Sequence, residues 1–140
     1  MKKTLQIFLP LIALLISPKA LSQVTASFYT SGTLSKVAIG YNFNERLWAD
    51  ARIYSSTSAD GITPEAVINY NYLAKESYYT YIGVGAIVND VNGVLIPIGV
   101  GIKPFENLKN LSINIELDPL YEIDDEDLYI NGFIGLRYKF

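Results

Sequence analysis

Apolar and polar residues alternate along most of this chain with a period of two. From position 111 to 118, Leu or Ile occupies every second position, and Ser, Asn, Glu and Asp stand between them. This period is that of a β-strand with two unlike faces, and after position 22 no segment shows the 3.6-residue period of an amphipathic helix. The pattern predicts eight strands, over 24–30, 35–43, 47–56, 64–73, 78–88, 93–103, 111–121 and 128–140.

Short segments with turn residues separate these strands. The pair Asp60-Gly61 marks one turn, and Asn92-Gly93 is suited to a tight hairpin. Because every connection is short, each strand should pair antiparallel with the next one along the chain. Pro97 lies within the strand over 93–103 and cannot donate a ladder hydrogen bond, so we expect a bulge or a local break there.

The two faces of the predicted strands differ in charge. One face is apolar and carries no charged residue. The other face carries nine charged residues, namely Lys36, Asp50, Arg52, Glu65, Lys103, Glu116, Asp118, Arg137 and Lys139. Two architectures fit this pattern. In a soluble barrel the apolar face points inward, whereas in a membrane barrel it contacts lipid and the charged face lines the lumen.

Glycines and aromatic residues favour the membrane barrel. Six glycines lie on the charged face, where a narrow lumen would use them to make room for long neighbours such as Arg52 and Arg137. The outward aromatic residues gather near one rim, like the girdle of a membrane barrel. They are Tyr41, Phe43, Tyr70, Tyr72, Tyr78, Tyr138 and Phe140. The predicted fold class is all-β: an eight-stranded antiparallel up-and-down transmembrane β-barrel with short turns.

The first 22 residues have the pattern of a secretory signal peptide. Two lysines precede an apolar run over 7–16, and Ala20-Leu21-Ser22 places small residues where a cleavage site requires them. The run is too short to span a bilayer as a helix, which needs about 20 residues. We therefore expect residues 1–22 to be removed and residues 23–140 to form one barrel domain in the cell outer membrane. The alternative is a retained N-terminal anchor.

Composition narrows the possible chemistry. The 140 residues include no Cys and no His, which excludes disulfides, thiol or imidazole catalysis and His/Cys zinc sites. The formal net charge is −3, and it becomes −6 without the three lysines of the expected signal peptide. Binding to nucleic acid phosphates needs a basic surface, so we expect no nucleic acid partner. We also expect no catalytic residues, no enzymatic activity and no cofactor.

The charged face supplies candidate ion pairs inside the barrel. An unpaired buried charge is strongly destabilising, so these side chains should pair with one another. The expected network comprises Lys36, Asp50, Arg52, Glu116, Asp118 and Arg137. Aromatic residues of the same face, including Tyr129, should help to fill the lumen, because an eight-stranded barrel is just wide enough for side chains. The alternatives are a proton or ion path, and acid–base chemistry by the two carboxylates of 116–118.

An acidic segment over 122–127 contains five carboxylates in six positions and faces the exterior in this topology. Asp124, Asp125, Glu126 and Asp127 are candidate ligands for a divalent cation, or for cations that bridge to lipopolysaccharide. The segment lacks the glycine and the spacing of an EF-hand loop. The alternative is a solvated loop whose charges keep the rim soluble.

The strand count, the aromatic band and the C-terminal segment 135–140 together resemble the small eight-stranded outer-membrane β-barrel proteins of Gram-negative bacteria, of the OmpA-transmembrane and OmpX type. The resemblance covers residues 23–140. It implies contact with outer-membrane lipid and lipopolysaccharide, and recognition of the final strand, which ends at Phe140, by the barrel-assembly machinery. Unlike OmpX-type proteins, this chain has no long extracellular loops, which weakens the case for an adhesive role.

The pattern and the resemblance together predict a non-enzymatic integral outer-membrane protein with a plugged polar lumen and no open pore. Its role would be structural, or it would interact through its short loops. One alternative is a soluble periplasmic or secreted β-barrel that binds a lipophilic ligand. Another is a small subunit of a larger envelope complex.

Overall fold

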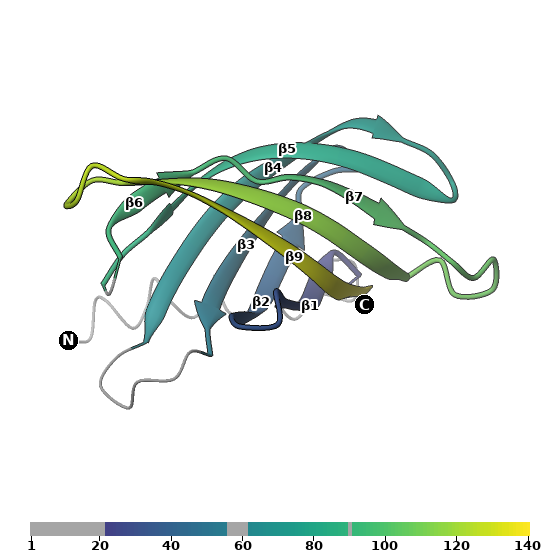
Figure 1. The fold of residues 1–140 in the computed structure, drawn as a ribbon. Helices are drawn as coiled ribbons and strands as arrows, with labels where there is room; N and C mark the ends of the chain where they lie inside the picture. The colour runs from purple at the N-terminus through teal and green to yellow at the C-terminus, as the bar shows by residue number, and fades with distance from the viewer. Residues whose placement is uncertain (1–21, 56–61, 90) are drawn as a thin grey trace, which may run out of the picture.

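The structure is a computed structural model that describes residues 22–55, 62–89 and 91–140. These residues form nine strand segments and no helix (Figure 1). The segments are β1 (Val24–Thr30), β2 (Ser35–Asn42), β3 (Leu47–Tyr54), β4 (Thr63–Ala74), β5 (Tyr78–Ile87), β6 (Gly93–Leu95), β7 (Ile98–Ile102), β8 (Leu111–Glu122) and β9 (Leu128–Lys139). Their outer bounds lie within two residues of the predicted ones. The expected signal peptide up to residue 21 and the turn pair Asp60-Gly61 lie outside the described residues.

The described strands close into an antiparallel barrel. Each strand from β1 to β5 pairs with the next, β6 and β7 both lie between β5 and β8, and β8 pairs with β9. The contact of β9 with β1, in which Leu136 lies opposite Phe28, completes the circle. Because β6 and β7 are two parts of one interrupted strand, the barrel has the eight strand positions that the sequence predicted.

The barrel has two ends, which carry different turns. We call the end that carries Phe140 and the turns over 43–46, 75–77 and 103–110 the C-terminal rim. The other end, with the turns over 31–34 and 123–127, is the opposite rim. In Figure 1 the green turn between β7 and β8 lies at the C-terminal rim, and the yellow turn between β8 and β9 lies at the opposite rim.

Pro97 interrupts the sixth strand without shifting its register. Leu95 and Ile98, on either side of it, pair with β5 in one continuous register. The Gly83 amide donates to the Pro97 carbonyl at 2.8 Å, but proline has no N–H to donate in return. Of the two outcomes expected at Pro97, the structure therefore has the local break. A bulge occurs instead in β4, within 71–73.

The charged face of the strands points into the barrel and the apolar face points outward. Arg52 is fully buried and Arg137 is 6% exposed, whereas Ile39 is 70% and Ile115 is 50% exposed. Seven of the nine charged residues of the predicted face are buried: Lys36, Asp50, Arg52, Glu65, Glu116, Asp118 and Arg137. The structure therefore has the charged face inside, which the alternation by itself left open.

Three glycines of the inner face, Gly99, Gly101 and Gly135, make room for tyrosine rings. A Cβ at Gly99 would overlap the ring of Tyr81, and a Cβ at Gly135 would overlap the ring of Tyr29. The sequence predicted that these glycines admit long neighbours, but the neighbours it named were arginines. The arginine head groups lie instead in ion pairs, and tyrosine rings fill the space beside these three glycines.

Three apolar clusters lie inside the described part of the barrel. Trp48, Tyr79 and Tyr81 form one near the C-terminal rim. A second lies towards the opposite rim and comprises Val67, Ile87, Leu95 and Leu120, and a third comprises Tyr29, Ala38 and Phe133. Because these clusters exclude water, they strengthen the electrostatic interactions among the charges buried between them.

Candidate functional site

A buried ion-pair network occupies the middle of the barrel. Lys36 of β2 is fully buried, and its ammonium contacts three carboxylates. The Nζ atom lies 3.4 Å from Glu65 Oε1 and 3.2 Å from Glu116 Oε1, and it also pairs with Asp118 Oδ2. It lies 4.1 Å from the centroid of the Phe133 ring as well. Every face of this ammonium is thus covered by carboxylate or aromatic groups.

Glu116 of β8 accepts hydrogen bonds from three other strands. The Nη1 and Nη2 atoms of Arg52 donate to its two oxygens at 2.7 and 3.0 Å, a bidentate arrangement. The Tyr81 hydroxyl donates to Oε2 at 2.6 Å, and Lys36 donates to Oε1. Glu116 therefore connects β2, β3, β5 and β8 across the lumen.

Glu65 belongs to the network, although the sequence analysis did not include it. Its Oε1 lies 3.0 Å from Arg52 Nη1, and its Oε2 accepts a hydrogen bond from the Tyr54 hydroxyl at 2.8 Å. The alternation of β4 does place Glu65 on the inner face. Which inner carboxylate meets which cation depends on the register between strands, and the alternation does not determine that register.

Arg137 of β9 forms a second centre nearer the C-terminal rim. Its guanidinium carbon lies 3.5 Å from the centroid of the Trp48 ring, and its Nη2 donates to Asn42 Oδ1 at 2.9 Å. Its Nη1 lies 3.7 Å from Asp50 Oδ1. Asp50 also pairs with Arg52 at 3.3 Å, so it links the two centres. The structure thus brings together all six residues that the sequence analysis assigned to the network.

The network is suited to stabilising the fold. It contains four carboxylates and three cations, and each of the seven side chains is nearly or fully buried. Removing one partner of such a pair leaves an uncompensated buried charge, so the network favours one strand register over others. Glu116 and Asp118 are buried from solvent and cannot touch a substrate in this conformation.

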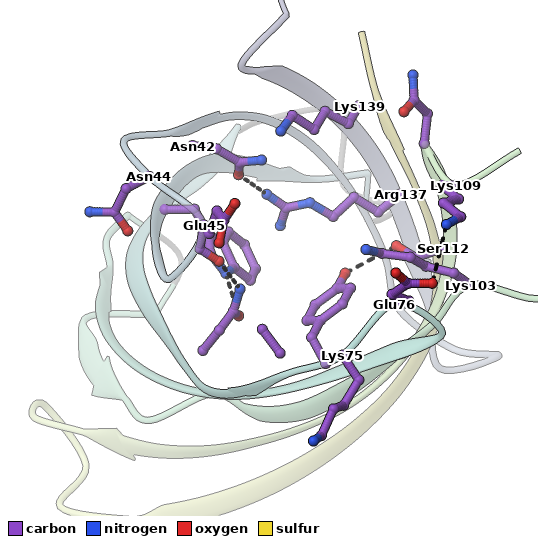
Figure 2. Close-up of a pocket in the computed structure, with 15 residues that line it drawn as sticks. Asn42, Asn44, Glu45, Lys75, Glu76, Lys103, Lys109, Ser112, Arg137 and Lys139 are labelled. Atoms are coloured by element: carbon purple, nitrogen blue, oxygen red, sulfur yellow. Dashed lines mark hydrogen bonds and ion pairs between the residues drawn. The ribbon is translucent and has the colours of Figure 1, made fainter.

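A cavity of about 590 Å³ opens at the C-terminal rim (Figure 2). We call it the cup. Buried Trp48 and Tyr79 line its inner end, and the Tyr79 hydroxyl is 3.0 Å from both Ser112 Oγ and Asn114 Oδ1. The charged residues that line it are Glu45, Lys75, Glu76, Lys103, Lys109, Arg137 and Lys139. With five basic and two acidic residues around it, the cup is cationic.

The cations of the cup lie close enough to affect one another. The pKa of Lys103 is lowered, first by its partial burial and then by the positive charges of Lys139 and Lys109. Lys109 pairs with Glu76 at 3.4 Å, but both side chains are solvent-exposed and the pair is weak. Among the described residues, Lys103 and Lys139 form no ion pair.

The seven aromatic residues of the expected girdle lie at the C-terminal rim. Six of them are exposed on the outer surface, and Tyr41 is partly exposed. Tyr41 packs edge-on against Phe43, and Tyr138 packs in the same way against Phe140, with centroid distances of 5.4 and 5.2 Å. The Tyr70 hydroxyl accepts a hydrogen bond from Arg46 at 3.2 Å.

Tyr129 lies at the opposite rim, and the prediction that it helps to fill the lumen is wrong. Tyr129 is 44% exposed, because the first three residues of β9 are all exposed and alternation does not lead to burial there. In the acidic turn, Asp124 accepts a hydrogen bond from Asn92 at 2.7 Å, and Asp127 accepts one from Tyr129 at 3.4 Å. In the described part of the chain, no group of three or more acidic, His or Cys side chains is arranged to hold a metal ion.

Within residues 22–55, 62–89 and 91–140, no helix is long and apolar enough to cross a membrane. Comparisons with models of protein families, with curated proteins and with solved structures find no match to this chain.

Proposed function

We propose that this chain is an integral outer-membrane β-barrel protein of the small eight-stranded kind, exported by a signal peptide over 1–22. It has a filled polar lumen and no open pore. It is not an enzyme, and it acts as a structural component of the membrane or interacts through its short extracellular turns.

The observation that carries this proposal is the inverted burial of the barrel. Charged side chains lie inside, and large apolar side chains cover the outside of the strands. Soluble monomers rarely expose contiguous apolar patches larger than a few hundred Å². In lipid, by contrast, an apolar outer band with a polar interior is the ordinary arrangement, and closure of the barrel pairs every strand edge.

The aromatic band suits that membrane, because rings at the C-terminal rim would lie at the level of the lipid head groups. We assign this rim, where β1 begins and β9 ends, to the periplasmic side. The turn over 123–127 then faces outward, towards lipopolysaccharide. The final strand, with Phe140 next to it, is the segment that we expect the barrel-assembly machinery to contact.

Buried side chains support a closed lumen. Arg52, Tyr29, Tyr81, Lys36 and Glu116 are all fully buried in the middle of the barrel, where a pore would have to pass. The absence of His and Cys from the sequence, and the use of the inner carboxylates in ion pairs, support a non-enzymatic role. A barrel that encloses a lipophilic ligand would need an apolar lumen, so the charged interior does not favour that alternative.

Two matched substitutions test the proposal. Ile115 in the middle of β8 is 50% exposed, and Ile123 in the turn after β8 is 56% exposed. An arginine costs about 2–4 kcal/mol at the bilayer midplane and about 0–1 kcal/mol near the interface. We therefore expect Ile115→Arg to reduce folding of the mature chain into phospholipid vesicles, and Ile123→Arg to leave it unchanged. The folded fraction is measured as the faster-migrating band of unboiled samples on a denaturing gel.

The same two variants distinguish a membrane barrel from a soluble barrel. In water the two isoleucines are equivalent, since both are about half exposed, and a soluble barrel would tolerate arginine at either position. Equal folding of the two variants, together with folding of the wild-type chain in buffer without detergent, would refute the membrane location.

A further inference from the structure

The cup at the C-terminal rim has the features of a binding site rather than of a gap between turns. Its volume of about 590 Å³ falls within the range of small-molecule pockets. Its inner end is rigid, because Trp48 is fixed by a hydrogen bond to Asn71 at 3.0 Å and Tyr79 by its bonds to Ser112 and Asn114. Cations from separate segments of the chain converge on this rigid base.

Three of these cations lack a full set of partners. Arg137 is 6% exposed, and its Nη1, which lies 3.7 Å from Asp50 Oδ1, has no hydrogen-bond partner among the described residues. Lys103 and Lys139 form no ion pair there, although Lys103 Nζ lies 6.0 Å from the centroid of the Tyr79 ring. Figure 2 shows Lys103, Arg137 and Lys139 around the same cavity. Like charges held together at a partly buried site destabilise the empty protein, and an anion would relieve that repulsion.

We infer that the cup binds a phosphate group, through Arg137, Lys103 and Lys139. This inference concerns the barrel itself and does not depend on the proposed membrane location. The group belongs either to a small soluble phosphate compound or to the head group of an anionic phospholipid.

The number of cations around the cup favours phosphate over a carboxylate. The Nη2 atom of Arg137 is engaged by Asn42 and its flat face lies on Trp48, so the two lysines supply most of the charge that is free to meet an anion. Lysine ammonium groups act as compact point charges, which suit the several oxygens and the larger charge of a phosphate.

The test uses the mature chain, folded in a non-ionic detergent or, if it folds there, in buffer. The probes are inorganic pyrophosphate and dihexanoyl phosphatidic acid, titrated by calorimetry. We expect saturable binding that weakens at high salt. Lys103→Gln and Lys139→Gln should each weaken it about tenfold, the loss expected for one charge-assisted contact.

Arg46→Gln is the matched control. It removes one positive charge from the same rim, but Arg46 lies on the outer surface against Tyr70 and does not line the cup. We expect the affinity of this variant for the phosphate probes to differ from that of the wild-type chain by less than about twofold, because a screened, exposed charge outside the site contributes little to binding. Far-UV circular dichroism verifies that each variant is folded.

A second measurement separates binding from structural support. The lowered pKa of Lys103 means that its charge opposes folding, and this penalty is largest below that pKa and fades as pH rises. Lys103→Gln should therefore bind phosphate less tightly without losing stability against urea. If Lys103 had only a structural role, Lys103→Gln would lower stability against urea and leave phosphate binding unchanged.

Each outcome of the titration decides between explanations. Binding of both probes with the expected lysine dependence supports the inference and indicates a soluble phosphate ligand. Binding of phosphatidic acid alone, with the same dependence, supports it and indicates a lipid head group. No binding of either probe, or binding that Arg46→Gln weakens as much as Lys103→Gln does, would overturn it.

Discussion

At the residue scale, two neighbouring carboxylates of β8 differ in how firmly they are bound. Glu116 and Asp118 both pair with Lys36. Glu116 also accepts a bidentate pair from Arg52 and a hydrogen bond from Tyr81, whereas Asp118 Oδ1 has no hydrogen-bond partner among the described residues. With four carboxylates for three cations, the network depends on Glu116 more than on Asp118.

This difference predicts unequal effects of two isosteric substitutions. We expect Glu116→Gln to lower the free energy of unfolding by about 3–5 kcal/mol, because it leaves Arg52 without its charged partner. Asp118→Asn should lower it by about 1 kcal/mol or less. Urea titration followed by the fluorescence of Trp48, the one tryptophan of the chain, measures both values. Equal losses would contradict the unequal roles assigned to the two side chains.

At the scale of a single strand, the two faces of β9 should respond differently to the same added methyl group. A Cβ at Gly135 would overlap the buried ring of Tyr29 and the carbonyl oxygen of Phe28. A Cβ at Gly132, on the outer face, would make only an ordinary contact of 3.6 Å with Leu117. We expect Gly135→Ala to destabilise the barrel by about 1–3 kcal/mol through overpacking.

Gly132→Ala is the control in the same strand. It should leave stability unchanged or raise it by up to about 1 kcal/mol, because alanine restricts the unfolded chain. Urea midpoints of the two variants provide the comparison. If Gly135→Ala were as stable as Gly132→Ala, tyrosine rings would not fill the lumen as the structure shows.

At the scale of the whole molecule, closure depends on the contact between β1 and β9. The chain has no cysteine, so a disulfide introduced there can be assigned without ambiguity. Phe28 and Leu136 lie opposite each other on the outer face. We expect Phe28→Cys combined with Leu136→Cys to form a disulfide on mild oxidation, detected as a mobility shift that a reducing agent reverses.

An off-register pair controls for random oxidation. Phe28→Cys combined with Ile130→Cys places the second thiol six residues further along β9, which is about 20 Å away. This pair should not cross-link within one chain. Efficient cross-linking of both pairs, or of neither, would indicate that β9 does not close the barrel in the observed register.

The local sequence pattern was sufficient to predict the strands of this fold. Strand positions, the antiparallel order and the break at Pro97 all follow from alternation, turn residues and the missing proline N–H, which are properties of short segments. The six candidate residues of the inner network could also be selected, because a period of two assigns every residue of a strand to one face. Tyr129 was misplaced because it lies in a stretch at the strand end where side chains on both faces are exposed.

The alternation by itself determined that this chain forms strands with one charged and one apolar face, but not which face is inside, because both barrels share that pattern. Only the tertiary structure decided the sidedness. It also decided the pairing of Lys36 with Glu116, 80 positions away, and the gathering of Arg137, Lys103 and Lys139 around the cup. These contacts depend on barrel closure and on the register between strands. Both bring together residues that are far apart in the sequence, and a period of two relates only residues within one strand.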